Sequence, residues 1–209
     1  DTAANYLTRP PKRSDVLSVF AGLRPLAAPR SEGKKTKEIS RSHKLIREKS
    51  GLITIIGGKW TTYRKMAQDT LDLAIRYMHI PTKDCITERY QIHGSRKNPD
   101  FSDPLYVYGT DADEIRNLVA SSPAMAEKLH PDYAYTVGEV TWLVRNEMPR
   151  TLEDVLARRL RILFLDARAA MAMAPKVAGI LATEWGKDET WTSAQVKAFN
   201  EVASNYILN

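Results

Sequence analysis

Residues 52–74, LITIIGGKWTTYRKMAQDTLDLA, indicate a strand, a glycine turn and a helix in direct succession. Leu52–Ile56 is a short apolar run rich in β-branched residues, which is typical of a buried strand. Gly57 and Gly58 end that run, and a helix is expected from there to about Met78. Its apolar face is formed by residues at helical spacing: Met66, Thr70, Leu73, Ala74 and Tyr77. A threonine at position 61 or 62 is expected to cap this helix.

Gly57-Gly58-Lys59 is not a nucleotide-binding P-loop. That motif requires a glycine five residues before Gly58, where this chain has Ile53, and a Ser or Thr where it has Trp60. The remaining signal is a helix N-terminus, whose free N–H groups favour an anionic ligand. The alternative is that the glycines only permit a tight turn and that Lys59 is solvated.

Upstream of this stretch, a second strand is expected at Val16–Ala21, with Arg24 just beyond its end. Residues 30–44 are polar and basic, which indicates an exposed loop or hairpin leading into a strand. Arg41 and His43 alternate there, so on an extended segment both side chains point to one face. An arginine fork suits a phosphate or carboxylate. A surface ion pair is the alternative for each arginine.

Downstream, residues 81–105 indicate a connector with at most one short strand near residues 90–92. The remainder is expected to be helical, at residues 111–120, 124–129, 136–147, 151–165, from near 166, 175–185 and 192–207. Expected helix starts are Thr151 with Asp154, Pro175, and Thr192 with Gln195, and Gly186 is an expected stop. The predicted fold class is therefore an α+β piece at residues 1–80, a connector at 81–105 and an all-α domain at 106–209.

Charge is unevenly distributed along the 209 residues, whose formal net charge is +6. Residues 1–104 hold 20 Lys and Arg against 11 Asp and Glu, whereas residues 105–209 hold 11 against 14. The basic front half favours anionic partners, whether a phosphate ligand, a nucleic acid or a lipid headgroup. Four charges interrupt the apolar stretch Leu160–Ala182, so no membrane-spanning helix is expected. The single Cys85 excludes an internal disulfide framework and favours a reducing, cytoplasmic location.

Five segments together resemble one enzyme family. In sequence order they are DVLSVFAGLRPL, ISRSHKL, LITIIGGKWTTYRKMAQDTLDLA, YQIHG and EVTWLVRNEMPRTLEDVLARRLRILFLDARAA. They are similar to the C-terminal half of FAD-dependent glycerol-3-phosphate dehydrogenases and the related oxidases, in the D-amino-acid-oxidase-like flavoprotein superfamily. The resemblance implies that residues 1–80 are the C-terminal piece of an FAD/substrate-binding domain and that residues 106–209 are a helical cap domain.

The resemblance also implies site residues. Arg24, Arg41 and Lys59 should bind the substrate, sn-glycerol 3-phosphate. The FAD cofactor should lie beside Gly57, Gly58, Lys59, Thr61 and Thr62 and bind to them. No catalytic residue and no metal ligand is assigned, and Trp60 is expected only to pack. The chain has no G-x-G-x-x-G motif, so it is expected to be inactive by itself.

The implied reaction is oxidation of sn-glycerol 3-phosphate to dihydroxyacetone phosphate by hydride transfer to FAD, with quinone or oxygen as the final acceptor. Peripheral attachment to the inner face of the cell membrane is compatible with it, and homo-oligomerisation is left open. The alternative function is a basic binding module, with Arg30–Lys44 holding nucleic acid or an anionic membrane surface. No nucleic-acid partner is expected, because the basic run has no interleaved aromatic residues for base stacking.

Overall fold

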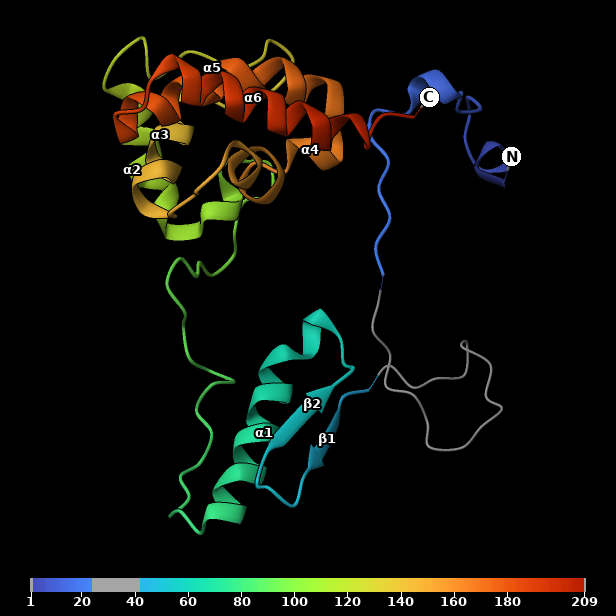
Figure 1. The fold of residues 1–209 in the computed structure, drawn as a ribbon, viewed down its shortest axis with the longest axis vertical. Helices are drawn as coiled ribbons and strands as arrows, with labels where there is room; N and C mark the ends of the chain where they lie inside the picture. The colour runs from blue at the N-terminus through green and yellow to red at the C-terminus, as the bar shows by residue number, and fades with distance from the viewer. Residues whose placement is uncertain (1, 24–41, 209) are drawn as a thin grey trace. The chain divides into compact units, whose positions relative to one another are not determined.

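The computed structural model describes residues 2–23 and 42–208, and its contacts divide the chain into two compact units (Figure 1). The hairpin unit comprises residues 22–92, and the helical unit comprises residues 1–21 and 93–209. The structure is thus rich in α-helix, with one small sheet, as expected for a fragment that ends in a helical domain.

The hairpin unit contains two antiparallel strands and one long helix. Strand β1 spans Lys44–Arg47 and pairs with β2, Ile53–Ile56, in the register that sets Lys44 opposite Ile56. After a short 3₁₀ turn at Trp60–Thr62, helix α1 runs over Tyr63–Met78 and packs against β2. It ends at His79, which is left-handed with φ 55°. The predicted order of strand, glycine turn and helix is therefore confirmed.

None of the described side chains in the hairpin unit is fully buried. All four residues of β2 are half-buried, although the sequence predicted a buried strand. Large apolar side chains such as Leu52, Leu71 and Met78 are more than half exposed. A strand pair and one helix cannot enclose a core, so this unit needs a further apolar surface to cover it.

The helical unit holds every fully buried apolar side chain of the described chain, all between Ala112 and Ala203. Its helices are α2 (Ala112–Ala120), α3 (Val137–Asn146), α4 (Ile162–Leu165), α5 (Ala167–Trp185) and α6 (Glu189–Ser204). A 3₁₀ segment at Tyr106–Asp111 precedes α2, and a π-helical segment at Asp154–Arg159 precedes α4. Shorter 3₁₀ turns lie at Thr2–Asn5 and Arg13–Asp15.

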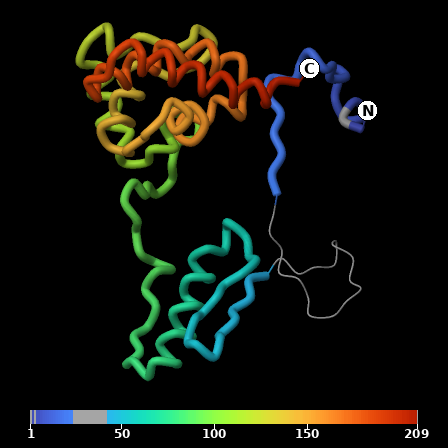
Figure 2. The backbone as a smooth tube through the Cα atoms, in the orientation of Figure 1, coloured from blue at the N-terminus to red at the C-terminus, as the bar shows by residue number. Residues whose placement is uncertain are grey.

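Helices α5 and α6 lie side by side and form the largest helix pair (Figure 2). The buried face of α5 is mostly alanine, which lets its neighbours approach the backbone closely. Larger side chains fill the space around it, including the fully buried Leu156, Leu163, Met173 and Phe199. The core of the chain therefore lies between α5 and the elements packed on it.

Several predicted helix ends are confirmed. Thr151 and Asp154 cap each other's backbone: the N–H of Thr151 donates to Asp154 Oδ2 over 3.0 Å, and that of Asp154 donates to Thr151 Oγ1 over 3.2 Å. Gly186 ends α5 in the left-handed conformation, with φ 62°. Arg161 is also left-handed, with φ 60°, and it breaks the predicted helix at residues 151–165 into two pieces.

Other predictions were wrong. Pro175 lies inside α5 instead of starting a helix, so one helix replaces the two expected. Helix α6 begins after Asp188, whose Oδ1 accepts from the Trp191 N–H over 2.8 Å, and not at Thr192. Residues 124–129 form turns and a bridge from Lys128 to Thr136, and residues 90–92 form no strand.

Residues 16–20, the N-terminal strap, do not form the strand that was predicted at Val16–Ala21. The strap binds the helical unit: the N–H of Val19 donates to the Tyr206 carbonyl over 2.8 Å, and the Ser18 hydroxyl donates to the Leu163 carbonyl over 2.8 Å. The Phe20 and Phe164 rings meet edge to face at 5.1 Å. Contacts therefore group residues 1–21 with the helices, whereas the sequence placed them with residues 22–80.

Candidate active site

The turn between β2 and α1 carries most of the residues predicted to form the site. Gly57 and Gly58 both have positive φ, 75° and 91°, which residues with a side chain rarely adopt. A Cβ on Gly58 would lie 2.5 Å from Met66 Sδ, but that flexible side chain can move, so the backbone conformation is the stronger requirement for glycine. The two glycines thus reverse the chain from strand into helix.

Lys59 and Thr62 close the turn on themselves. The backbone N–H of Lys59 donates to Thr62 Oγ1 over 3.2 Å, and the Thr62 hydroxyl donates to the Lys59 carbonyl over 3.0 Å. Thr62 is the residue before α1, but its side chain makes no capping bond to an N–H of that helix. The predicted cap is therefore wrong: the Thr62 side chain bonds to the Lys59 backbone instead. The threonine stabilises the turn instead of the first turn of α1.

The start of this helix presents free donors to the surface of the hairpin unit. Within the described ranges, the N–H groups of Trp60 and Thr61 face no acceptor. Lys59 is exposed and forms no ion pair with any described acid, and Trp60 is 90% exposed. The packing expected of Trp60 is limited, among the described residues of the hairpin unit, to the Tyr63 ring, whose centre lies 6.4 Å away. The arrangement offers N–H donors and a cation to an anionic group.

Arg24 and Arg41 lie outside the described residues, so their role in substrate binding stays a prediction. His43, two positions after Arg41, is described: its Nε2 lies 2.9 Å from Asp69 Oδ2. Lys65 Nζ donates to the other oxygen of Asp69 over 2.7 Å. The hydrogen bond from Lys65, followed by that from His43, lowers the pKa of Asp69 below its usual value.

The residues of this turn fit one edge of an FAD molecule. Trp60 and Thr61, whose N–H groups meet no acceptor in the described chain, and Lys59, which pairs with no described acid, would match the oxygen-rich edge of a flavin ring in charge and in hydrogen-bond type. The sequence supplies no glycine-rich dinucleotide turn for a pyrophosphate. No group of three potential metal ligands occurs among the residues that the structure describes.

The helical unit contains a buried acid that sequence reasoning missed. Glu139 is 5% exposed and accepts a hydrogen bond of 2.7 Å from the Tyr108 hydroxyl. Burial raises the pKa of Glu139 to about 7, although hydrogen bonds from Tyr108 and the Thr136 N–H lower it. Thr136 and Glu139 have the sequence spacing of a capping box, and that pattern could have drawn attention to Glu139.

In a Glu139→Gln variant, the unfolding free energy should depend less on pH than it does in the parent chain. The folded state holds the Glu139 proton more tightly than the unfolded state, in which the pKa of Glu is about 4.3. The contribution of Glu139 to the unfolding free energy is therefore fully present below about pH 4 and is lost as the pH rises through about 7. At about 1.4 kcal/mol per pKa unit, the parent should lose on the order of 1–3 kcal/mol more than the variant between pH 5 and pH 8.

Urea unfolding followed by tryptophan fluorescence measures this difference, because Trp142, Trp185 and Trp191 all lie in the helical unit. Glu201→Gln, at an exposed position of α6, is the matched control and should keep the pH dependence of the parent. Equal pH dependence in the Glu139→Gln variant and the parent would show that the buried acid does not titrate in this range.

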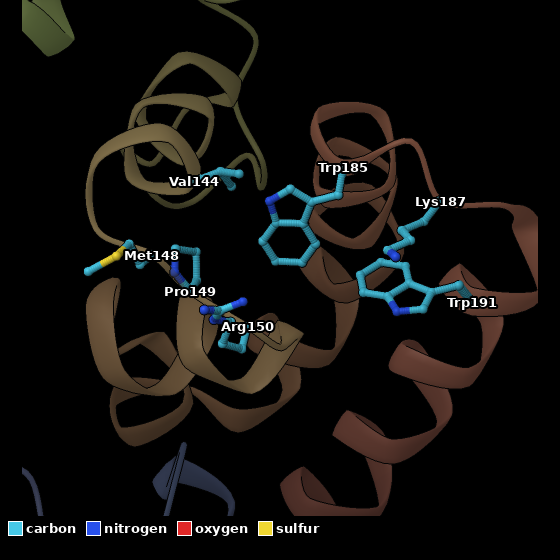
Figure 3. A pocket seen from close by; sticks show the side chains of 7 residues that line it. All are labelled: Val144, Met148, Pro149, Arg150, Trp185, Lys187 and Trp191. Carbon is cyan, nitrogen blue, oxygen red and sulfur yellow. The ribbon is translucent and has the colours of Figure 1, made fainter.

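A groove of about 500 Å³ lies where α3, α5 and α6 meet (Figure 3). The Trp185 and Trp191 rings meet edge to face at 5.7 Å on one side of it. Met148, Pro149 and Arg150 lie on the opposite side (Figure 3). No sequence pattern points to this groove, because its lining residues come from separate segments that only the fold brings together.

Comparison with known proteins identifies the family. The model of one family, the C-terminal domain of alpha-glycerophosphate oxidase, matches residues 52–192, which is more than half of the chain. The chain belongs to this family. The match begins at the strand before the candidate site and ends in α6.

Mitochondrial glycerol-3-phosphate dehydrogenases are similar to almost the whole chain. The Arabidopsis thaliana protein named glycerol-3-phosphate dehydrogenase SDP6 is 32% identical over 98% of this chain. A probable enzyme of the same name from Caenorhabditis elegans is 36% identical over 94%, and the Mesocricetus auratus enzyme is 31% identical over 94%. The predicted resemblance to glycerol-3-phosphate dehydrogenases is therefore confirmed.

The chain spans only 40% of the Arabidopsis relative and 29% of the other two. All three relatives carry mitochondrial in their names. Among the described helices, none is both long and apolar enough to cross a bilayer.

Proposed function

We propose that this chain is the C-terminal part of an FAD-dependent enzyme that oxidises sn-glycerol 3-phosphate to dihydroxyacetone phosphate. The observation that carries the proposal is the glycine turn with its exposed helix start, which lies inside the family match. The names of the relatives supply the substrate. The chain alone is expected to be inactive, because it has no dinucleotide-binding motif.

In this reaction the substrate loses a hydride from C2 and a proton from its C2 hydroxyl, giving a ketone. FAD, when bound, supplies the two-electron acceptor for the hydride. Gly57, Gly58, Lys59, Thr61 and Thr62 would hold the cofactor along the turn. The N–H groups at the start of the helix would stabilise negative charge beside them, and the Lys59 ammonium would add a cation at the same place.

Arg24 and Arg41 would bind the phosphate of the substrate through charge-assisted hydrogen bonds, with Lys59 near the same group. Electrons would then pass to quinone or oxygen. We also propose peripheral attachment to a membrane through the basic front half, on the inner face of the cell membrane, and a cytoplasmic location. The mitochondrial names of the relatives favour the corresponding membrane of that organelle if the protein is eukaryotic.

An Arg24→Lys variant of the intact enzyme tests the role in substrate binding. Lysine keeps the charge but loses the bidentate fork. The activation free energy for sn-glycerol 3-phosphate should therefore rise by about 1.5–3 kcal/mol per lost hydrogen bond, and turnover should fall accordingly. The measurement is kcat/KM with sn-glycerol 3-phosphate and, in parallel, with glycerol. Glycerol has no phosphate, so its slow turnover should change much less.

The flavin content of Arg24→Lys should stay at the level of the parent. Arg9→Lys, at an exposed position, is the matched control and should leave kcat/KM unchanged with both compounds. Equal losses with sn-glycerol 3-phosphate and glycerol, or loss of flavin from Arg24→Lys, would assign Arg24 a structural role instead.

A further inference from the structure

His43 lies against the glycine turn on the side of the hairpin. Lys44, the residue after His43, pairs with Ile56, the residue before Gly57, at the end of the antiparallel ladder. A Cβ built on Gly58 would be 3.4 Å from the Cβ of His43, and Met66 of α1 lies on the same side. One residue of the hairpin and one residue of the helix therefore both lie beside Gly58.

The imidazole of His43 continues past the turn to helix α1. Its Nε2 lies 2.9 Å from Asp69 Oδ2, and the side chains of His43 and Asp69 are only 21% and 28% exposed. An ionised carboxylate accepts but does not donate, so the hydrogen atom lies on His43 Nε2. Lys65, one helical turn before Asp69, donates to the other carboxylate oxygen over 2.7 Å.

The hairpin is attached to α1 at both ends. At the far end, the Arg47 guanidinium lies 4.0 Å from the centre of the Tyr77 ring. At the near end, the bond from His43 to Asp69 holds the first residues of the hairpin against the helix beside Gly57 and Gly58. Loss of this bond would free the end of the hairpin next to the turn and leave the far attachment in place.

We propose that His43 and Asp69 are positioning residues, whose hydrogen bond fixes the turn at Gly57–Thr62 relative to the hairpin and so aligns the candidate active site. The proposal rests on the proposed function. Neither residue need touch the substrate or the cofactor. Their effect is exerted through the turn, where a misplacement of about 1 Å can lower a rate by about a hundredfold.

In the intact enzyme, Asp69→Ala and His43→Ala should each lower kcat for sn-glycerol 3-phosphate about tenfold to a hundredfold. The KM and the flavin content should change little, because the residues that bind remain. The double variant should be no slower than the slower single variant, since both substitutions remove one and the same bond. Asp69→Asn and His43→Gln keep an acceptor and a donor at these positions and should recover most of the lost rate.

Lys65→Gln is the matched control. It removes the more exposed partner of Asp69 but leaves the bond to His43, so kcat should stay within about twofold of the parent. Amide hydrogen exchange in the intact protein gives a second readout that needs no substrate. The Thr62 N–H, bonded to the Lys59 carbonyl at 3.0 Å, should exchange faster in Asp69→Ala and at the parental rate in Lys65→Gln.

Unchanged kcat in both alanine variants would overturn the proposal, and so would losses that multiply in the double variant as for independent sites. Equal losses in Asp69→Ala and Asp69→Asn would assign the effect to charge, which also overturns it. If the parent itself carries flavin that sn-glycerol 3-phosphate does not reduce, the proposed function fails. The exchange experiment still decides whether the bond from His43 to Asp69 fixes the turn.

Discussion

Replacing Phe199 with alanine is expected to lower the unfolding free energy of the helical unit by about 3–5 kcal/mol. Phe199 is 2% exposed and lies on the face of α6 that packs against α5, the largest helix pair of the chain. Alanine would lose the transfer free energy of the ring and leave a cavity, since well-packed surroundings collapse only in part. Urea unfolding of the full chain, followed by tryptophan fluorescence, measures the change.

Phe101→Ala is the matched control, because it is the same substitution in the same unit at a side chain that is 75% exposed. Its ring lies 5.4 Å from that of Tyr106, and the loss of such a pair is worth at most about 1.5 kcal/mol. Equal destabilisation by the two substitutions would mean that the contact of α6 with α5 is not the centre of this core.

Gly109→Ala is expected to destabilise the helical unit by about 2–4 kcal/mol, through backbone strain and a lost hydrogen bond. Gly109 has φ 56° and ψ −119°, a conformation that only glycine adopts readily. A Cβ there would lie 1.7 Å from the carbonyl oxygen of Gly94, which accepts from the Thr110 N–H over 3.1 Å. Backbone atoms cannot rotate away as a side chain can, so this hydrogen bond should break.

Gly179→Ala gives the opposite expectation and serves as the control. Gly179 lies inside α5 with no atom within 4 Å of an added Cβ, so alanine should stabilise the chain by up to about 1 kcal/mol through helix propensity. The same urea experiment measures both variants. A stability of Gly109→Ala equal to that of the parent would show that the segment from Gly94 to Thr110 adjusts without strain.

The sequence was most informative where one local signal dominates. The β-branched run before Gly57 and the spacing of apolar residues after it specify β2 and α1, because both patterns depend on neighbours along the chain. It was least informative where tertiary packing decides. The apolar run at Val16–Ala21 fits a strand equally well, but it packs as a strap on helices that follow about 140 residues later.

Helix boundaries depended on choices between similar signals. Pro175 is common in first turns, yet α5 continues through it; it lies on an exposed part of the helix. Asp188 and Thr192 are both good caps, and only the structure selects Asp188. In the candidate site, no sequence pattern shows that His43 reaches the carboxylate of Asp69, because the two residues come from different elements that only the fold brings together.

The strap gives the chain the topology of a domain insertion. Because residues 16–20 and 93–209 belong to one unit, the segment 22–92 leaves that unit and returns to it. Two backbone connections, rather than one, therefore join the unit that carries the candidate site to the helical unit. A single cut within the segment would leave two fragments held together only by non-covalent contacts, among them the hydrogen bonds and the Phe20–Phe164 contact of the strap.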